Sequence, residues 1–159
     1  MDIITVRFIS KWPPNIASLL VARCGGSKQF SHVLNMIDGM AYEATFNHGC
    51  RIVPVKQAME GASYYQDMYV PVQNIETAIN FGKMQRGKKY DVAGALGIPF
   101  LMSEDWGDWS KWWCSEFAFM QIGIGGNFLF DKDAQKRITP QHLHMCNYKK
   151  SELKKYIPD

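Results

Sequence analysis

Short apolar runs in the first half of the chain have the pattern typical of strands. Ile3–Ile9 is rich in β-branched residues and predicts the first strand. Phe30–Ile37 and Met40–Phe46 are two more such runs, and Asp38-Gly39 alone separates them. This dipeptide favours a two-residue type I′ turn, because both central positions of that turn need positive φ. We therefore expect an antiparallel hairpin. Two further runs predict the remaining strands, over Arg51–Val55 and Tyr64–Val72.

Helical patterns occur before and after this block of strands. In Asn74–Arg86, the residues on one helical face are apolar or small, whereas the other positions are mostly polar. The expected helices cover 16–23, Asn74–Arg86, Val92–Met102 and Trp113–Ile122, with one more beginning at Thr139-Pro140. No linker or repeat divides the chain, so we expect a single domain over residues 1–159. The order of helix, strands and helices predicts the α+β class.

The composition is that of an ordinary globular protein, with 47% apolar and 21% charged residues. Eighteen basic residues against fifteen acidic ones give a net charge of +3, too mild for a nucleic-acid-binding surface. The basic tail, Lys149-Lys150 and Lys154-Lys155, is expected to be a solvated helix face.

The four cysteines are widely spaced and include no Cys-x-x-Cys pair. No basic leader precedes an apolar run at the N-terminus, so we expect no secretory signal and reduced thiols in a cytoplasm. The longest uncharged, mostly apolar stretch, Val92–Met102, has about half the length that spans a bilayer. We therefore expect no integral membrane contact.

The predicted hairpin register places two ionisable residues together. A two-residue turn pairs His32 with Thr45 and Leu34 with Glu43, so His32 and Glu43 become diagonal neighbours on one face. A three-residue turn would move Glu43 to the other face. A carboxylate next to an imidazole fixes the tautomer of the ring and supports its charged form.

Cys114 lies where a helix is expected to begin, and backbone dipoles favour a thiolate there. If His32 meets this sulfur in space, the chain holds a nucleophile, a base and an orienting carboxylate in Glu43. That set predicts a thiol hydrolase or acyltransferase that needs no cofactor. The alternative is a structural His–Glu pair together with an inert, packed cysteine.

Several short sequence motifs resemble one known family when they are taken in order. These are Phe30-Ser31-His32-Val33, Asp38-Gly39, Tyr42-Glu43-Ala44, Gly49-Cys50-Arg51-Ile52-Val53-Pro54, Gly87-Lys88-Lys89-Tyr90-Asp91 and Trp113-Cys114-Ser115-Glu116-Phe117. Over residues 3–125, they are similar to the circularly permuted branch of the NlpC-type papain-like superfamily, which includes bacterial and phage proteins. In that branch the strand with the histidine comes before the helix with the cysteine.

The resemblance implies a permuted papain-like fold, with a central antiparallel sheet packed against helices. It also implies Cys114 as nucleophile, His32 as base, Glu43 as third member, and Tyr90 as a pocket-lining or oxyanion-supporting residue. The implied activity is that of a cysteine peptidase or amidase on a peptide, isopeptide or cell-wall-like substrate. Lipid-ester hydrolysis or acyl transfer is an alternative, as is a non-catalytic binding or virion protein. The location would be cytoplasmic, or in the virion if a phage encodes the chain; the oligomeric state stays open.

Other signals in the sequence are weaker. The segment 82–89 nearly matches a phosphate-binding loop, but it has no Ser or Thr for magnesium and follows a helical pattern. His142, His144 and Cys146 provide three candidate metal ligands, one fewer than a structural zinc site needs. His48 and Cys50 form a second thiol–imidazole pair, without a helix start. The tryptophans of the 106–113 segment fit a lid over the core or a substrate-shaping loop.

Overall fold

The computed structural model describes residues 1–10, 30–92, 110–131 and 138–158. Within these residues, six strands form one antiparallel sheet in the order β4-β3-β2-β1-β5-β6. The strands are β1 (Asp2–Ser10), β2 (His32–Ile37), β3 (Met40–Thr45), β4 (Gly49–Pro54), β5 (Tyr64–Val72) and β6 (Lys154–Lys155). The helices are α2 (Val55–Ala58), α3 (Ile75–Gln85), α5 (Cys114–Ile124) and α6 (Pro140–His144). The predicted α+β class is confirmed.

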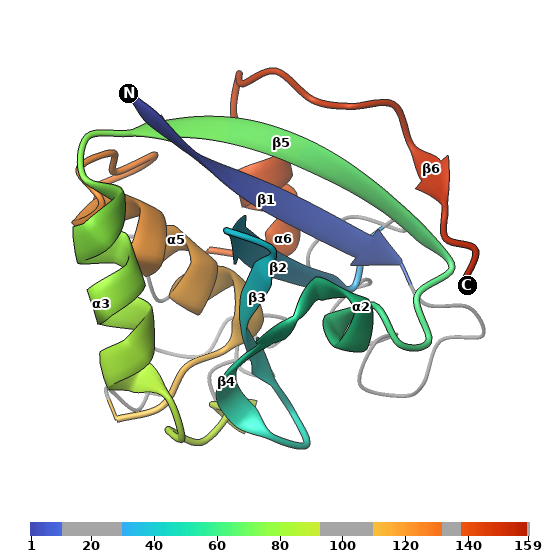
Figure 1. The fold of residues 1–159 in the computed structure, drawn as a ribbon, viewed down its shortest axis with the longest axis horizontal. Coiled ribbons are helices and arrows are strands. Elements are labelled where there is room, and N and C mark those ends of the chain that lie inside the picture. Colours follow the sequence, from blue (N-terminus) through green and yellow to red (C-terminus); the bar gives the residue numbers. More distant parts are fainter. Residues whose placement is uncertain (11–29, 93–109, 132–137, 159) are drawn as a thin grey trace.

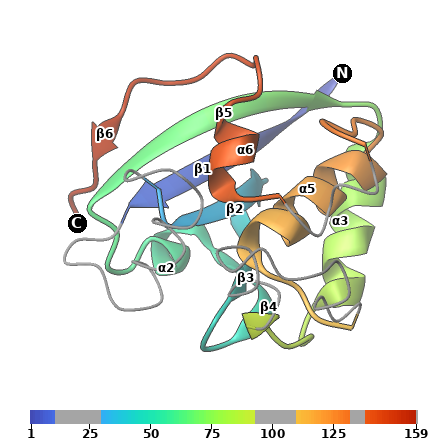
Figure 2. The ribbon, with the colours of Figure 1, turned by 180° about the vertical axis from the view of Figure 1, so that it is seen from behind.

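Three helices, α3, α5 and α6, cover one face of the sheet, and α3 and α5 lie side by side (Figures 1 and 2). The main core lies between these layers, where alternate residues of β1 meet apolar residues of the helices. Its fully buried members include Ile4, Val6, Phe8, Ala78, Phe117 and Leu143. A smaller cluster around Leu34, Ala41 and Met59 joins the opposite face to α2, a helix that the apolar pattern did not predict.

The β2–β3 hairpin closes as predicted. Asp38 and Gly39 have φ of 49° and 75°, and Ile37 pairs with Met40. The ladder between these strands ends at the pair Asn35–Tyr42, before the predicted pairs that involve His32 and Glu43. Beyond that point β2 stays paired with β1, whereas β3 stays paired with β4. Figure 1 shows β3 and β4 crossing the direction of β1 and β5 steeply.

A buried polar bridge holds α5 on the sheet. The Asn35 Nδ2 group donates to the Ala118 carbonyl and to Gln121 Oε1, each at 3.0 Å. The Gln121 Nε2 group in turn donates to the Ala78 carbonyl of α3 at 3.1 Å. Because unpaired amides are costly in an apolar core, these bonds define how α5 lies on β2 and α3.

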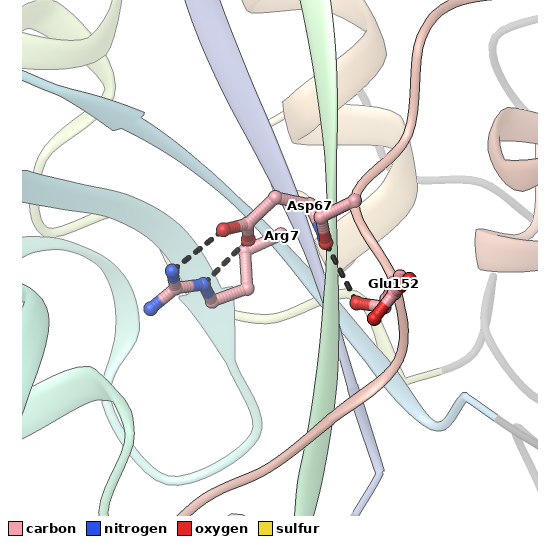
Figure 3. A network of polar contacts seen from close by, with 4 residues as sticks. Arg7, Asp67 and Glu152 are labelled. Carbon is pink, nitrogen blue, oxygen red and sulfur yellow. Dashed lines mark hydrogen bonds and ion pairs between the residues drawn. The ribbon is translucent and has the colours of Figure 1, made fainter.

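The prediction of a helix for the basic tail was wrong. Lys150 bridges to Met68, and Lys154–Lys155 pairs with Tyr64 and Tyr65 as a short strand at the edge of the sheet. The outer edge of β5 offers backbone groups that a helix would leave open, and the tail takes them along most of β5. A neighbouring ion pair joins β1 to β5: Arg7 donates to both Asp67 oxygens, at 2.7 and 2.8 Å (Figure 3).

The remaining predictions of helices have mixed outcomes. Asn74–Arg86 and Trp113–Ile122 correspond to α3 and α5, and α6 begins after Thr139, whose side chain caps it. The helix expected at 16–23, and Val92–Met102 beyond Val92, lie outside the described residues. Among the helices that the structure describes, none combines the length and apolar character that a bilayer span requires.

The start of β4, at Gly49 and Cys50, contacts the segment that precedes Tyr90. Cys50 donates its N–H to the Lys88 carbonyl at 2.8 Å and accepts the Gly87 N–H at 2.9 Å. Gly49 has φ of +64°, and a Cβ added there would clash with the Lys88 carbonyl oxygen. Both the conformation and the close approach therefore require glycine.

We predict that Gly49→Ala destabilises the fold more than Gly61→Ala. Gly61 has φ of +74° but open space around it, so its substitution isolates the conformational cost of about 1–2 kcal/mol. Gly49→Ala adds an overpacking cost of roughly 1 kcal/mol or more. Denaturant unfolding of both variants measures the difference, and equal losses would show that the contact with Lys88 is unimportant.

Candidate active site

The structure brings His32 and Glu43 together as the hairpin register predicts. His32 is the first residue of β2, and its Nε2 atom lies 2.6 Å from Glu43 Oε2. The Glu43 side chain is 1% exposed and that of His32 is 14% exposed. Since Nε2 is bonded to the carboxylate, Nδ1 is the ring nitrogen left to exchange a proton with another group.

Cys114 supplies that other group. It is the first residue of α5, it is 2% exposed, and its side chain hydrogen-bonds that of His32. Burial opposes charge on both residues. The bonds of His32 to Cys114 and Glu43 outweigh this and raise the pKa of His32 from 6.5 to about 9. For Cys114 burial is likewise outweighed, chiefly by His32, and the pKa of the thiol is lowered.

Opposite shifts of this kind favour a thiolate beside an imidazolium. The ion pair exists above the lowered pKa of Cys114 and below about 9, where His32 loses its proton. As the pH falls through the lower limit, the sulfur is protonated and its nucleophilicity is lost.

Arg51 is a member of this cluster that sequence reasoning missed. It lies opposite Glu43 on the neighbouring strand β4, and its Nε and Nη2 atoms each lie 2.7 Å from Glu43 Oε1. Each carboxylate oxygen therefore has its own cationic partner. Burial would raise the pKa of Glu43, but His32 and Arg51 together lower it. Extending the register across the next hairpin, from Thr45–Gly49 to Glu43–Arg51, would have revealed Arg51.

Tyr90 also contacts Cys114. A parallel bridge pairs it with Trp112, two residues before Cys114, and flanking backbone bonds fix the two segments. The Tyr90 hydroxyl donates to the Cys114 sulfur and accepts the Cys114 backbone N–H. Burial raises the pKa of Tyr90 well above its usual value, so the phenol keeps its proton and remains a donor.

The other cysteines have different surroundings. Cys50 is 2% exposed, and burial raises the pKa of its thiol to about 12. Burial also raises the pKa of Cys146, despite nearby Lys150. All three described cysteines are free, whereas Cys24 lies outside the described residues, as do Trp106 and Trp109.

Two of the candidate metal ligands have other bonds. His142 Nδ1 accepts the N–H of Thr139 at 3.2 Å as part of the cap of α6. His144 Nε2 lies 2.8 Å from Gln66 Oε1, and its ring packs against Phe8 and Phe30.

The cluster can support nucleophilic chemistry at sulfur. It combines an acidified thiol, an imidazole whose second nitrogen is bonded to a carboxylate, and hydrogen-bond donors at the start of a helix. No protein-family model matches this chain, and no curated protein shows detectable sequence similarity to it.

We predict that Cys114 is alkylated by iodoacetamide faster than Cys50, by about tenfold or more, because His32 lowers the pKa of the Cys114 thiol whereas burial raises that of Cys50. The two residues have the same exposure of 2% but opposite pKa shifts, so Cys50 is a matched control. Peptide mapping by mass spectrometry measures both rates. His32→Ala should remove the preference, and equal modification in the unsubstituted protein would contradict the ion pair.

We predict that Arg51→Gln lowers the free energy of unfolding by about 1–3 kcal/mol near neutral pH, because a buried carboxylate loses a charged partner. The lowered pKa of Glu43 stabilises the fold above its unfolded value and loses this effect as pH falls. The deficit of Arg51→Gln should therefore shrink in acid. Arg86→Gln, at an exposed position, serves as the control and should change stability by less than about 0.5 kcal/mol. A deficit independent of pH would contradict this role.

Proposed function

We propose that this chain is a cysteine-dependent acyl hydrolase of the amidase or peptidase type, with Cys114, His32 and Glu43 as its catalytic set. The observation that carries the proposal is the contact between Cys114 and His32, with opposite pKa shifts on sulfur and imidazole. Structural cysteines in apolar surroundings have raised pKa values, as Cys50 does. A buried ion pair at a helix start is instead typical of an activated nucleophile.

The same proposal assigns the fold to the circularly permuted papain-like type, in the NlpC-type branch. Support comes from the order of the parts: a β-strand carries the histidine early in the chain, and the cysteine opens a helix packed on that strand. The antiparallel sheet packed against helices agrees with the architecture that the resemblance implies.

In the first half-reaction the Cys114 sulfur attacks the carbonyl carbon of the substrate and forms a tetrahedral intermediate. As the sulfur loses its charge to the new bond, the Cys114 N–H and the Tyr90 hydroxyl exchange their bonds to each other and to the sulfur for bonds to the developing oxyanion. The His32 imidazolium gives its proton to the leaving amine, and the carbon–nitrogen bond breaks. A thioester between Cys114 and the acyl group remains.

In the second half-reaction neutral His32 takes a proton from water, and the oxygen of that water attacks the thioester carbon. The carbon–sulfur bond breaks, the acid leaves, and the sulfur regains its negative charge beside the protonated imidazole. Glu43 keeps its bond to Nε2 throughout, while Arg51 keeps the carboxylate ionised.

Lipid-ester hydrolysis or acyl transfer is a second candidate, favoured by one observation. Phe46, the residue after β3, is 59% exposed, and its ring centroid lies 6.2 Å from that of Tyr90. An exposed aromatic ring beside Tyr90, which itself bonds Cys114, suits a hydrophobic acyl group.

Exposure to panels of activated amides, esters and thioesters, followed by intact-mass measurement, tests the proposal. We predict an acyl adduct that Cys114→Ala abolishes and Cys50→Ala retains. His32→Ala should slow adduct formation by about a hundredfold or more, and Glu43→Gln by roughly tenfold, because the carboxylate acts through the orientation of the ring. Whether the amides or the esters react distinguishes an amidase from a lipid esterase. A folded protein that forms no adduct with any panel would favour the non-catalytic alternative.

A further inference from the structure

The backbone ladder between β2 and β3 ends before it reaches the residues of β2 that lie near Cys114. In a hairpin with a two-residue turn, the residues next to the turn exchange both backbone hydrogen bonds, and so does every second pair after them. Ile37–Met40 and Asn35–Tyr42 are such pairs, and Val33–Ala44 would be the next one. The assigned ladder ends at Asn35–Tyr42, so the Val33 N–H, which points toward β3, needs another acceptor.

The packing of α5 on β2 shows which acceptor lies there. Asn35 is bonded to the carbonyl of Ala118, four residues after Cys114. Four residues of helix rise about 6 Å, and two residues of strand advance about 6.6 Å, nearly the same distance. Val33 lies two residues before Asn35 on β2, and Cys114 lies four residues before Ala118 on α5. The two residues are therefore expected to face each other in the same way as Asn35 and Ala118. The Val33 backbone N–H is accordingly a hydrogen-bond donor to the Cys114 sulfur.

We propose that the backbone N–H of Val33 is a positioning group for the nucleophile, freed by the early end of the β2–β3 ladder to hold the Cys114 sulfur in its charged form. The His32 side chain and this N–H, both from β2, and the Tyr90 hydroxyl, from the segment after α3, then surround the sulfur. A backbone donor in the sheet does not change protonation state and has little freedom to move, and the Val33 side chain is fully buried. It therefore keeps the sulfur aligned while His32 gains and loses its proton. This role in catalysis rests on the proposed function, whereas the contact itself does not.

Replacing Val33 by its α-hydroxy acid turns the amide into an ester and removes only the donor. We expect the apparent pKa of Cys114, measured from the pH dependence of its alkylation, to rise by roughly one unit. The matched control is the same replacement at Asn35, which removes a donor of the β2–β3 ladder and leaves the Val33 N–H in place. Val33→Ala keeps the N–H and should leave the profile unchanged. An unchanged profile in the folded Val33 ester, or an equal shift in the Asn35 ester, would overturn the proposal.

A second measurement uses the unmodified backbone, in case the ester does not fold. In ¹⁵N–¹H NMR spectra, the Val33 amide signal should follow the ionisation of Cys114, and this response should disappear in Cys114→Ala. A Val33 amide that is insensitive to Cys114 would refute the contact. Neither measurement requires turnover. If Cys114 forms an acyl adduct but neither measurement detects the Val33 contact, only the positioning role is refuted. If the contact is detected but no adduct forms, the contact stands and the proposed hydrolase function does not.

Discussion

The contact between the Cys114 sulfur and the His32 imidazole is the interaction on which the functional account depends. A charged pair in a buried setting is costly to desolvate unless its members have further partners. Here the partners continue in a row across the sheet, because β4, β3 and β2 are adjacent and present Arg51, Glu43 and His32 in that order. The charges alternate in sign from the guanidinium to the sulfur, so each ion has an opposite neighbour on at least one side.

The fold supports this row by controlling where strands pair and where they separate. The two-residue turn fixes the register at the closed end of the hairpin, and beyond Asn35–Tyr42 the two strands separate, while α5 contacts both of them. The Asn35–Gln121 bridge then holds α5 along β2, whereas the contact of Gly49 with Lys88 holds the segment that carries Tyr90. Residues that do not touch the sulfur thus fix the geometry around it.

Much of this arrangement could be predicted from the sequence where a local rule applies. Asp38-Gly39 determines its turn, and the turn determines which residues of β2 and β3 meet. Other features depend on long-range packing. The tail pairs with the edge of β5 because that edge is open, which no local pattern of lysines reveals. The short helix α2 follows from burial of Ala58 and Met59 against the sheet. Arg51 was accessible to register reasoning, but the early end of the ladder was not, since no local pattern in His32–Ile37 or Met40–Thr45 marks it.

The most direct test is an NMR titration of the His32 ring. The account predicts that this imidazole stays protonated until about pH 9, and that Cys114→Ala lowers its pKa by more than about one unit, because the partner charge is gone. A transition near the ordinary value of 6.5 that Cys114→Ala leaves unchanged would contradict the ion pair, and with it the assignment of Cys114 as an activated nucleophile.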